Sequence, residues 1–390
     1  MPNYSSSVGI VGGGITGLIA GCTLQEQGIK TVVFERSKSL NTDGAGITIS
    51  PNGLRVLQKL QIKDALVQTS FLPNKILFHQ KNTNITKIVS PNDFVTSSRY
   101  NLLQILQQKY LDLGGEVLYD HKFKSINQDE IKITFANNLE YEVSHILACD
   151  GINSSVREEF FPANGPAIYS GYQAWRGIGK AQQSEAKFYF SKGKHVVSYP
   201  INNKGEVSFT AVVKNDLNTS DSWRIKGSKT ELLKDFNEFD KEIFSMLDSS
   251  DEIYKWGIYI RPVLKSIYIK NITLLGDAAH PMVPFLGQGG CMAIEDGYAF
   301  GKLAAANSNN FSRTQADFEK VRLDRKNLIQ AASKTQGKIY HLENPLFVFF
   351  RNLFLKYTPI VKARTQQIWS YKIDKDIEKL ILYCLLYTSD

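Results

Sequence analysis

Residues 8–21 read VGIVGGGITGLIAG, an apolar run that passes into a cluster of glycines and then into more apolar residues. Val8 to Val11 has the composition of a short buried strand. Ile15 to Gln27 carries apolar residues at helical spacing, and Gly28 ends that helix. Thr31 to Phe34 is a second, β-branched strand. This βαβ opening predicts a parallel sheet and an α/β fold.

The glycines follow the spacing Gly12-x-Gly14-x-x-Gly17, and the helix begins at Ile15. Glycine permits the tight turn and lets the backbone approach a pyrophosphate, which the N-terminus of the helix attracts. Glu35 ends the second strand, where its carboxylate can accept hydrogen bonds from a ribose diol. The sequence therefore predicts a dinucleotide site, with Gly12, Gly14, Ile15, Gly17 and Glu35 among its residues.

Two later segments distinguish the flavin dinucleotide from the nicotinamide one. HILACDGINSSVR (residues 145–157) places Asp150 after an apolar strand. ITLLGDAAHPMVPFLGQGGCMAIEDG (residues 272–297) places Asp277 after another strand, where it can hold ribityl or ribose hydroxyls. The glycines at 287, 289 and 290 precede a helix and offer backbone N–H groups to the pyrimidine edge of a flavin.

The middle of the chain has a different pattern. From Tyr169 to Tyr268, period-two segments such as HVVSYPI and VSFTAVV alternate with polar turns, which predicts an antiparallel sheet. We expect it to be inserted between parts of the parallel sheet. The predicted FAD-binding domain comprises residues 1–75, 99–168 and 270–336, and the substrate domain comprises 76–98 and 169–269. Residues 337–383 form a C-terminal helical segment.

Composition is that of an ordinary globular protein, with 390 residues, 43% apolar and 22% charged. The net charge of +8 is mild, and no nucleic-acid motif is present. Four dispersed cysteines indicate neither a metal site nor a disulfide framework. The N-terminus lacks the pattern of a signal peptide, and no stretch approaches the ~20 apolar residues of a membrane span. We therefore expect a cytoplasmic protein.

These segments together resemble the group A flavoprotein monooxygenases, the family of salicylate hydroxylase, 3-hydroxybenzoate 6-hydroxylase and FAD-dependent urate hydroxylase. The resemblance runs from about Val8 to Lys372, and it includes GAGITISPNG (residues 44–53), SGYQAWRG (170–177) and HVVSYP (195–200). It implies the fold of para-hydroxybenzoate hydroxylase: a Rossmann-like FAD-binding domain with a parallel sheet, an inserted antiparallel-sheet substrate domain and C-terminal helices.

The resemblance also implies a cofactor set and a reaction. Gly14, Glu35, Arg99 and Asp277 would bind FAD, with Arg36 near the adenine and further contributions from Gly46 and Asp150. NAD(P)H would act as a transient co-substrate that reduces the flavin. O2 would then form a flavin C4a-hydroperoxide, which hydroxylates a small aromatic or heteroaromatic substrate without a metal.

Four residues are predicted on the substrate side: Arg176, His195, Tyr199 and Pro284. His195 and Tyr199 share one strand face at i and i+4, so either can serve as a base or proton relay, although His195 can equally be structural. Arg176 is either a substrate or flavin contact or a salt-bridged strand residue. The related hydroxybenzoate enzyme has HIVHYP where this chain has HVVSYP, so Ser198 replaces a histidine and weakens the case for a hydroxybenzoate substrate.

Several alternatives stay open. The substrate can instead be a quinone precursor or another lipid-like or polycyclic compound, and the same scaffold can serve a flavin reductase or a redox-sensing flavoprotein. The apolar segment Asn344 to Tyr357 is expected to pack against the substrate domain, with a peripheral membrane contact as the alternative. Residues 384–390 match no predicted element and resemble translated cloning material.

Overall fold

A parallel sheet carries the glycine loop. In the computed structural model, which describes residues 3–40, 46–81, 83–162, 165, 167–215 and 225–387, this sheet has the strand order β17-β18-β11-β1-β2-β7. Its strands are β1 (Val8–Val11), β2 (Thr31–Phe34), β7 (Glu116–Leu118), β11 (His145–Ala148), β17 (Tyr268–Ile269) and β18 (Ile272–Leu274). All neighbours pair in parallel except β17 with β18. The predicted βαβ opening and parallel sheet are confirmed.

Helices cover this sheet, and small residues bring two of them close together. They are α1 (Ile15–Glu26), α4 (Arg99–Asp112), α8 (Gly289–Ala306) and the long α9 (Phe311–Tyr340). A Cβ atom added at Gly297 in α8 would lie 2.7 Å from the backbone nitrogen of Ala20 in α1, so glycine permits this contact. Smaller elements complete this part of the molecule: β3 (Gly46–Ile49), α2 (Pro51–Lys59), α3 (Lys63–Gln68), β6 (Val95–Ser98), β8 (Phe123–Asn127), β9 (Lys132–Phe135), β10 (Glu140–Glu142) and α5 (Ser155–Phe160).

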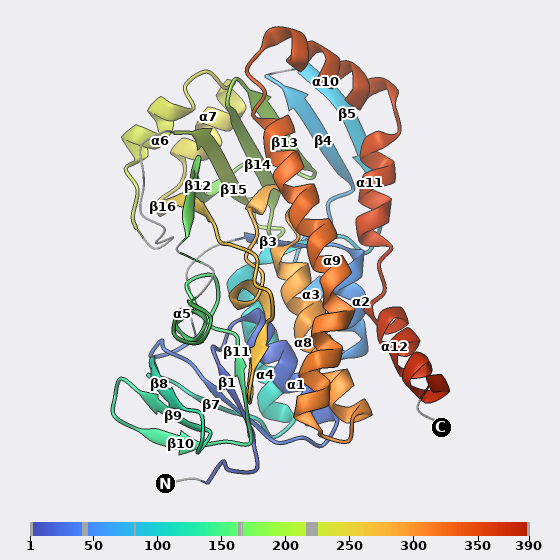
Figure 1. The fold of residues 1–390 in the computed structure, drawn as a ribbon. Helices are drawn as coiled ribbons and strands as arrows, with labels where there is room; N and C mark the ends of the chain where they lie inside the picture. Colours follow the sequence, from blue (N-terminus) through green and yellow to red (C-terminus); the bar gives the residue numbers. More distant parts are fainter. Residues whose placement is uncertain are drawn as a thin grey trace.

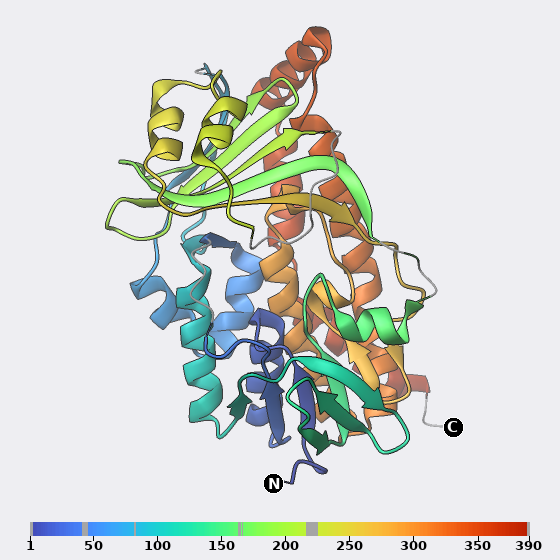
Figure 2. The same cartoon turned by 90° about the vertical axis from the view of Figure 1, so that its left-hand side faces the viewer.

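The second large sheet has seven strands in the order β16-β12-β15-β14-β13-β4-β5. Its strands are β4 (Lys75–Gln80), β5 (Thr83–Val89), β12 (Ile168–Lys180), β13 (Ala186–Ser191), β14 (Lys194–Pro200), β15 (Glu206–Lys214) and β16 (Ile253–Ile260). The predicted antiparallel sheet is present, but β4 joins it parallel to β13. Figure 2 shows this sheet lying across the end of the parallel-sheet unit.

The two faces of this sheet meet different partners because side chains alternate along each strand. The outer face includes Trp175 and Phe209 and is covered by α6 (Lys229–Asp235) and α7 (Lys241–Asp248), neither of which the sequence analysis anticipated. The inner face includes Ala174 and Tyr199, and it packs on Phe285 and Tyr340 from the helical side of the molecule.

The C-terminal helices meet one expectation only in part. They are α10 (Pro345–Tyr357), α11 (Ile360–Trp369) and α12 (Ile373–Tyr387). We expected 344–357 to pack against the substrate domain, and α10 does contact β5 there, but it buries only one side and exposes most of its apolar residues. The backbone of 384–387 continues α12, so the expectation of no regular element was wrong there, while 388–390 lie outside the described residues. Across the described chain, no helix combines the length and the apolar character needed to cross a membrane.

Candidate functional site

The glycine loop between β1 and α1 is shaped by close backbone contacts. Gly12 has a φ of 110°, and a Cβ atom there would lie 2.5 Å from the carbonyl oxygen of Cys149, just after the neighbouring strand β11. A Cβ at Gly17 would lie 2.0 Å from the carbonyl oxygen of Gly12. Gly14 is different, because a Cβ atom there would have no neighbouring atom within 4 Å. Two glycines therefore make the turn, and the third leaves open space at the start of the helix.

Glu35 lies beside this loop at the end of β2. One carboxylate oxygen accepts a hydrogen bond from the Gly13 N–H at 2.8 Å, and the other accepts one from the Ser37 N–H at 2.9 Å. These two bonds fix the carboxylate next to the glycines. Arg36 follows it, and Lys122 lies on the same pocket wall. The site thus combines an acid held by backbone donors with nearby cations.

Asp150 follows β11, and one of its oxygens is buried without a hydrogen-bond partner among the described residues. The other oxygen accepts the N–H of Val156 at 3.3 Å. Burial raises the pKa of Asp150, and its hydrogen bonds oppose that rise. A buried acceptor without a partner is costly, so this oxygen is suited to a ligand that donates a hydrogen bond.

Arg157 has a structural position rather than a position on the pocket wall. Its guanidinium donates to the carbonyl oxygens of Ala278 at 3.0 Å and Pro262 at 2.7 Å. These bonds connect α5 to the turn that carries Asp277, the 3-10 helix η2 (Gly276–Ala278).

Asp277 lines the cavity, where its side chain is accessible. Burial raises its pKa, while His280 and Arg99 act in the opposite direction. Behind it, Asp296 on α8 accepts the N–H of Gly276 at 2.9 Å and pairs with the guanidinium of Arg322 at 2.6 Å. This buried ion pair holds the Asp277 turn against α8.

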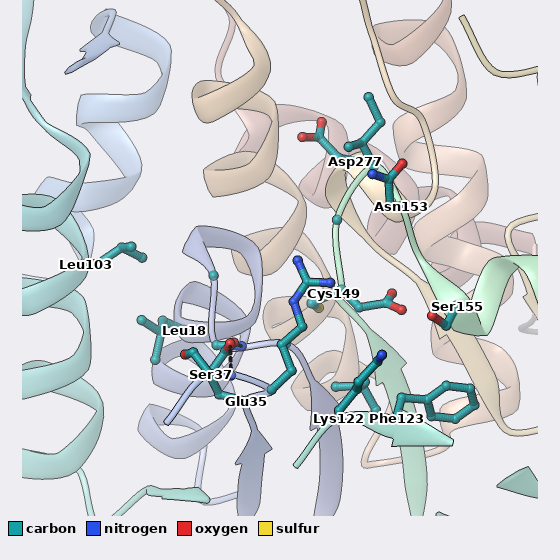
Figure 3. A pocket seen from close by; sticks show the side chains of 18 of the residues that line it. Leu18, Glu35, Ser37, Leu103, Lys122, Phe123, Cys149, Asn153, Ser155 and Asp277 are labelled. Carbon is teal, nitrogen blue, oxygen red and sulfur yellow. Dashed lines mark hydrogen bonds between the residues drawn. The ribbon is translucent and has the colours of Figure 1, made fainter. Parts of the chain in front are cut away.

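One continuous cavity joins these features to the inserted sheet. Its wall includes the glycine loop, Glu35 and Lys122 at one end. At the other end it includes Arg176 on β12, Trp256 on β16 and Pro284 in the 3-10 helix η3 (Pro284–Leu286). Figure 3 shows Asp277 and Asn153 at one end of the pocket and Glu35 and Lys122 toward the other. Glycines and charged side chains line this cavity between the glycine loop and the inserted sheet.

The predicted site residues divide into two groups by position. Those on the cavity wall are Gly12, Gly14, Glu35, Arg36, Arg99, Asp150, Arg176, Asp277 and Pro284. Those outside the cavity lining are Ile15, Gly17, Gly46, His195, Tyr199, Gly287, Gly289 and Gly290. Gly289 begins α8 with open space at its Cβ position, and Gly287 has a φ of 61°.

Arg176 and Tyr199 lie next to each other where β3 meets the inserted sheet. The Arg176 guanidinium donates to the carbonyl oxygen of Gly46. The Gly46 N–H donates to the Ser208 hydroxyl at 3.1 Å, and a Cβ at Gly46 would lie 2.8 Å from the Tyr199 ring. The Nε atom of Arg176 is buried without a partner among the described residues. Burial lowers the Arg176 pKa to about 10, which keeps the guanidinium charged at neutral pH.

His195 is buried in an aromatic cluster on the same strand face as Tyr199. Its Nδ1 lies 2.8 Å from the Nε2 of His341, whose own Nδ1 lies 2.7 Å from the carbonyl oxygen of Gly337. The carbonyl can only accept, so His341 donates from Nδ1 and accepts at Nε2. His195 must then donate from Nδ1, which leaves its Nε2 as a lone-pair acceptor. The pair fixes the tautomer of His195.

Ser198 gives a correction. The difference between HVVSYP and HIVHYP was expected to remove a base, but the Ser198 hydroxyl donates to Gln183 at 3.1 Å on the opposite side of β14 from His195. Alternation along the strand places position 198 on the outer face. The serine therefore changes no group on the inner face, so the expected loss of a base does not apply here, while the identity of the substrate stays a prediction.

Sequence reasoning missed several residues of this region. Lys122, Asn153, Trp256, Tyr259 and Arg261 line the cavity, and His341 supports His195. Lys122 follows the short β7 without any motif, and β16 returns to the cavity only through its pairing with β12. These residues come together only in the folded structure, so no local sequence pattern indicates them.

The residues present fit a flavin dinucleotide. The open Cβ position at Gly14 leaves space for a pyrophosphate, the orphaned Asp150 oxygen can accept a hydroxyl, and Glu35 lies where a ribose would be bound. Comparison with known families agrees: the family described as FAD binding domain matches residues 5–312. The chain belongs to this family. It is an FAD-dependent monooxygenase of the group A aromatic hydroxylases.

Similar proteins support this assignment along most of the chain. The monooxygenase is 27% identical to 6-hydroxynicotinate 3-monooxygenase of Pseudomonas fluorescens, over 93% of this chain and 99% of that protein. It is also 27% identical to 3-amino-4-hydroxybenzoate 2-monooxygenase of Streptomyces platensis, over 87% and 90%. A structure of a salicylate hydroxylase substrate complex superposes with a TM-score of 0.80 at 20% identity, covering 97% of this chain and 98% of that one. The last likeness confirms the predicted fold.

Proposed function

We propose that this flavoprotein uses NAD(P)H and O2 to hydroxylate a small aromatic or heteroaromatic acid. The observation that carries the proposal is the continuous cavity from the glycine loop to Arg176 on the inserted sheet. Bound FAD supplies the redox chemistry and the activation of O2. The residues of the chain need only bind and orient the substrate, accept a proton from it and exclude water.

Arg176 is the residue that we assign to the anionic group of the substrate. Its guanidinium is buried and charged, has no carboxylate partner among the described residues, and keeps one N–H group unpaired. A guanidinium recognises a carboxylate or phenolate oxygen through charge-assisted hydrogen bonds. The relatives that act on hydroxynicotinate and aminohydroxybenzoate, both ring acids, agree with this choice.

His195 is our candidate for the proton acceptor, and because it lies outside the cavity lining, four residues from Tyr199 on β14, a substrate proton would reach it through intervening groups, of which Tyr199 is our candidate nearest to Arg176. Burial lowers the pKa of His195 well below its ordinary value, and His341 lowers it further, so the imidazole is neutral at physiological pH. The bond to His341 leaves the Nε2 lone pair available. His341 is a positioning residue in this scheme, because it acts through His195.

A substrate screen tests the proposal. Purified holoenzyme is mixed with NADH or NADPH, and the rate of nicotinamide oxidation is recorded with a panel of hydroxylated benzoates, nicotinates, purines and quinone precursors. We expect a ring acid to accelerate oxidation and to yield a product heavier by one oxygen atom. A nicotinamide oxidation that no compound accelerates, with H2O2 as the sole product, would contradict the proposal in favour of a flavin reductase.

A further inference from the structure

The helix α10 presents an apolar face to solvent. Of the 19 large apolar residues that are exposed in the described part of the chain, seven lie within its 13 residues. Their exposed fractions range from 41% to 69%, and they are Leu346, Phe347, Phe349, Phe350, Leu353, Phe354 and Tyr357. Contiguous exposed patches of this kind mark interaction surfaces. We call these seven residues the α10 face.

The orientation of this helix is fixed by its other side. Arg351 is buried, donates to Gln80 on β4 and to the Ile339 carbonyl oxygen at 3.3 Å, and lies 4.7 Å from the ring centre of Phe190. Leu355 packs on the inner core of the inserted sheet. At 100° per residue, the seven apolar residues fall within a sector of about 160° that excludes Arg351 and Leu355. The apolar face therefore points outward because the polar anchor points inward.

Exposed lysines accompany the α10 face. Between Lys338 and Lys372 there are six basic residues, of which Arg351 is buried and Arg364 donates to groups on α9, and the one acid, Glu343, is paired with Lys214 at 2.9 Å. Lys356 lies on the helix itself and Lys362 on the adjoining α11, and both are exposed. The edge strand β5, which contacts α10, adds Lys87. An apolar face with a cationic rim is complementary to a surface that is apolar inside and anionic at its boundary.

We propose that α10 binds the surface of a lipid bilayer that contains anionic lipid. The helix would lie in the plane of the interface, with its phenylalanines among the acyl chains and its lysines at the headgroups. At 1.5 Å per residue it is about 20 Å long, which is shorter than the ~30 Å hydrocarbon core, so it cannot cross. Figure 1 shows α10 at the end of the molecule opposite the parallel sheet, where contact leaves that sheet free.

The charges favour a membrane over a second copy of the chain. In a twofold dimer the same patch meets itself, so the lysine rim of one copy would face the lysine rim of the other. Within the described residues of this rim, the acid Glu343 already has its cation. An anionic lipid surface provides the missing counter-charge.

Vesicle binding of the full-length holoenzyme tests the proposal. Sedimentation is measured at physiological salt with vesicles of phosphatidylcholine alone and with vesicles that also contain about 30% phosphatidylglycerol, which gives a strongly anionic surface. We expect binding to the anionic vesicles that weakens as salt rises. The variant Phe347→Ser/Phe350→Ser/Phe354→Ser should reduce partitioning about tenfold or more. The variant Lys356→Glu/Lys362→Glu should abolish the preference for anionic lipid.

The matched control replaces three apolar residues of comparable exposure elsewhere. Leu111→Ser/Ile168→Ser/Leu323→Ser removes side chains with exposed fractions of 41%, 62% and 44%, and it should bind vesicles as the wild type does. Far-ultraviolet circular dichroism and FAD content check that each variant is folded. Wild-type protein that stays in the supernatant with anionic vesicles would overturn the proposal. So would a wild-type dimer in analytical ultracentrifugation that the triple phenylalanine variant converts to a monomer.

Discussion

The Nδ1 atom of His195 on β14 lies 2.8 Å from the Nε2 atom of His341, just beyond the end of α9. The two histidines come from different parts of the chain and are both buried. Burial lowers the pKa of His341 to about 4, and it lowers that of His195 well below the ordinary value. Both rings are therefore neutral in the folded protein at neutral pH.

This pair predicts a stability that falls on acidification. In the unfolded chain each histidine has a pKa near 6.5, so between pH 6.5 and about 4 the unfolded state binds more protons than the folded state. Stability is full above pH 6.5 and is lost as pH falls through this window. From pH 7 to pH 5, His341 alone should account for about 2 kcal/mol of the free energy of unfolding.

Urea unfolding of wild type and His341→Asn at pH 8, 7 and 5 measures this effect. The wild type should lose more stability than the variant between pH 7 and 5, and the two should change equally between pH 8 and 7. Parallel pH curves over the whole range would mean that the histidines are not buried as neutral rings.

Arg176→Lys should separate substrate recognition from cofactor binding. Lysine keeps the charge but loses the planar fork, so we expect substrate-stimulated nicotinamide oxidation to fall about tenfold to a hundredfold, with unchanged FAD content. The control Lys180→Met alters an exposed cation on the same strand and should leave the rate unchanged. Equal rates for Arg176→Lys and the wild type would remove Arg176 from the substrate site.

Gly14 and Gly17 should respond differently to alanine. Gly14 has a φ of −79° and open space around its Cβ position, so Gly14→Ala should leave the stability of the FAD-free protein unchanged and weaken FAD binding. Gly17→Ala places its methyl against the Gly12 carbonyl and should destabilise the fold itself, by about 1–3 kcal/mol. Thermal unfolding with and without FAD, together with flavin fluorescence titration, distinguishes the two. A Gly14→Ala protein that retains the wild-type affinity for FAD would place the pyrophosphate elsewhere.

Asp296→Asn tests the ion pair behind the Asp277 turn. Burial raises the Asp296 pKa, but His280 and Arg322 outweigh it and hold it at about 2. Loss of the carboxylate leaves the Arg322 guanidinium buried with less counter-charge, so we expect a loss of about 3–5 kcal/mol in denaturant unfolding. Asp317→Asn breaks a partly exposed pair with Arg313 and should cost less than about 1 kcal/mol. Similar losses in the two variants would contradict a special role for the buried pair.

Local pattern was sufficient for the cofactor half of the molecule. The strand Val8–Val11 has the predicted bounds because it is buried on both faces and followed by glycine, so sequence and environment agree. Most of the predicted residues that line the cavity on that side, such as Gly12, Glu35 and Asp150, follow strands with recognisable motifs, whereas Lys122 does not. The exact domain boundaries, NAD(P)H use and the roles of the individual site residues stay predictions.

The local sequence pattern did not predict burial that depends on segments distant in the chain. The helix 345–357 is apolar like a core helix, and its sequence does not reveal that its outer face lacks a covering element among the described residues. Likewise, the pairing of β4 with β13 joins residues about a hundred positions apart, and alternation alone did not reveal which face of β14 Ser198 occupies. Such features depend on contacts that no local window contains.

The cavity wall also has a consequence for biosynthesis. It is assembled from the Gly12 loop, Asp150 and Asp277, which are distant in the sequence and are therefore synthesised at different stages of translation. Contacts of such long sequence separation form late and slowly. A nascent chain that ends before β18 has its nucleotide loop but no Asp277 turn, so the growing polypeptide should capture its flavin only after about three-quarters of translation is complete.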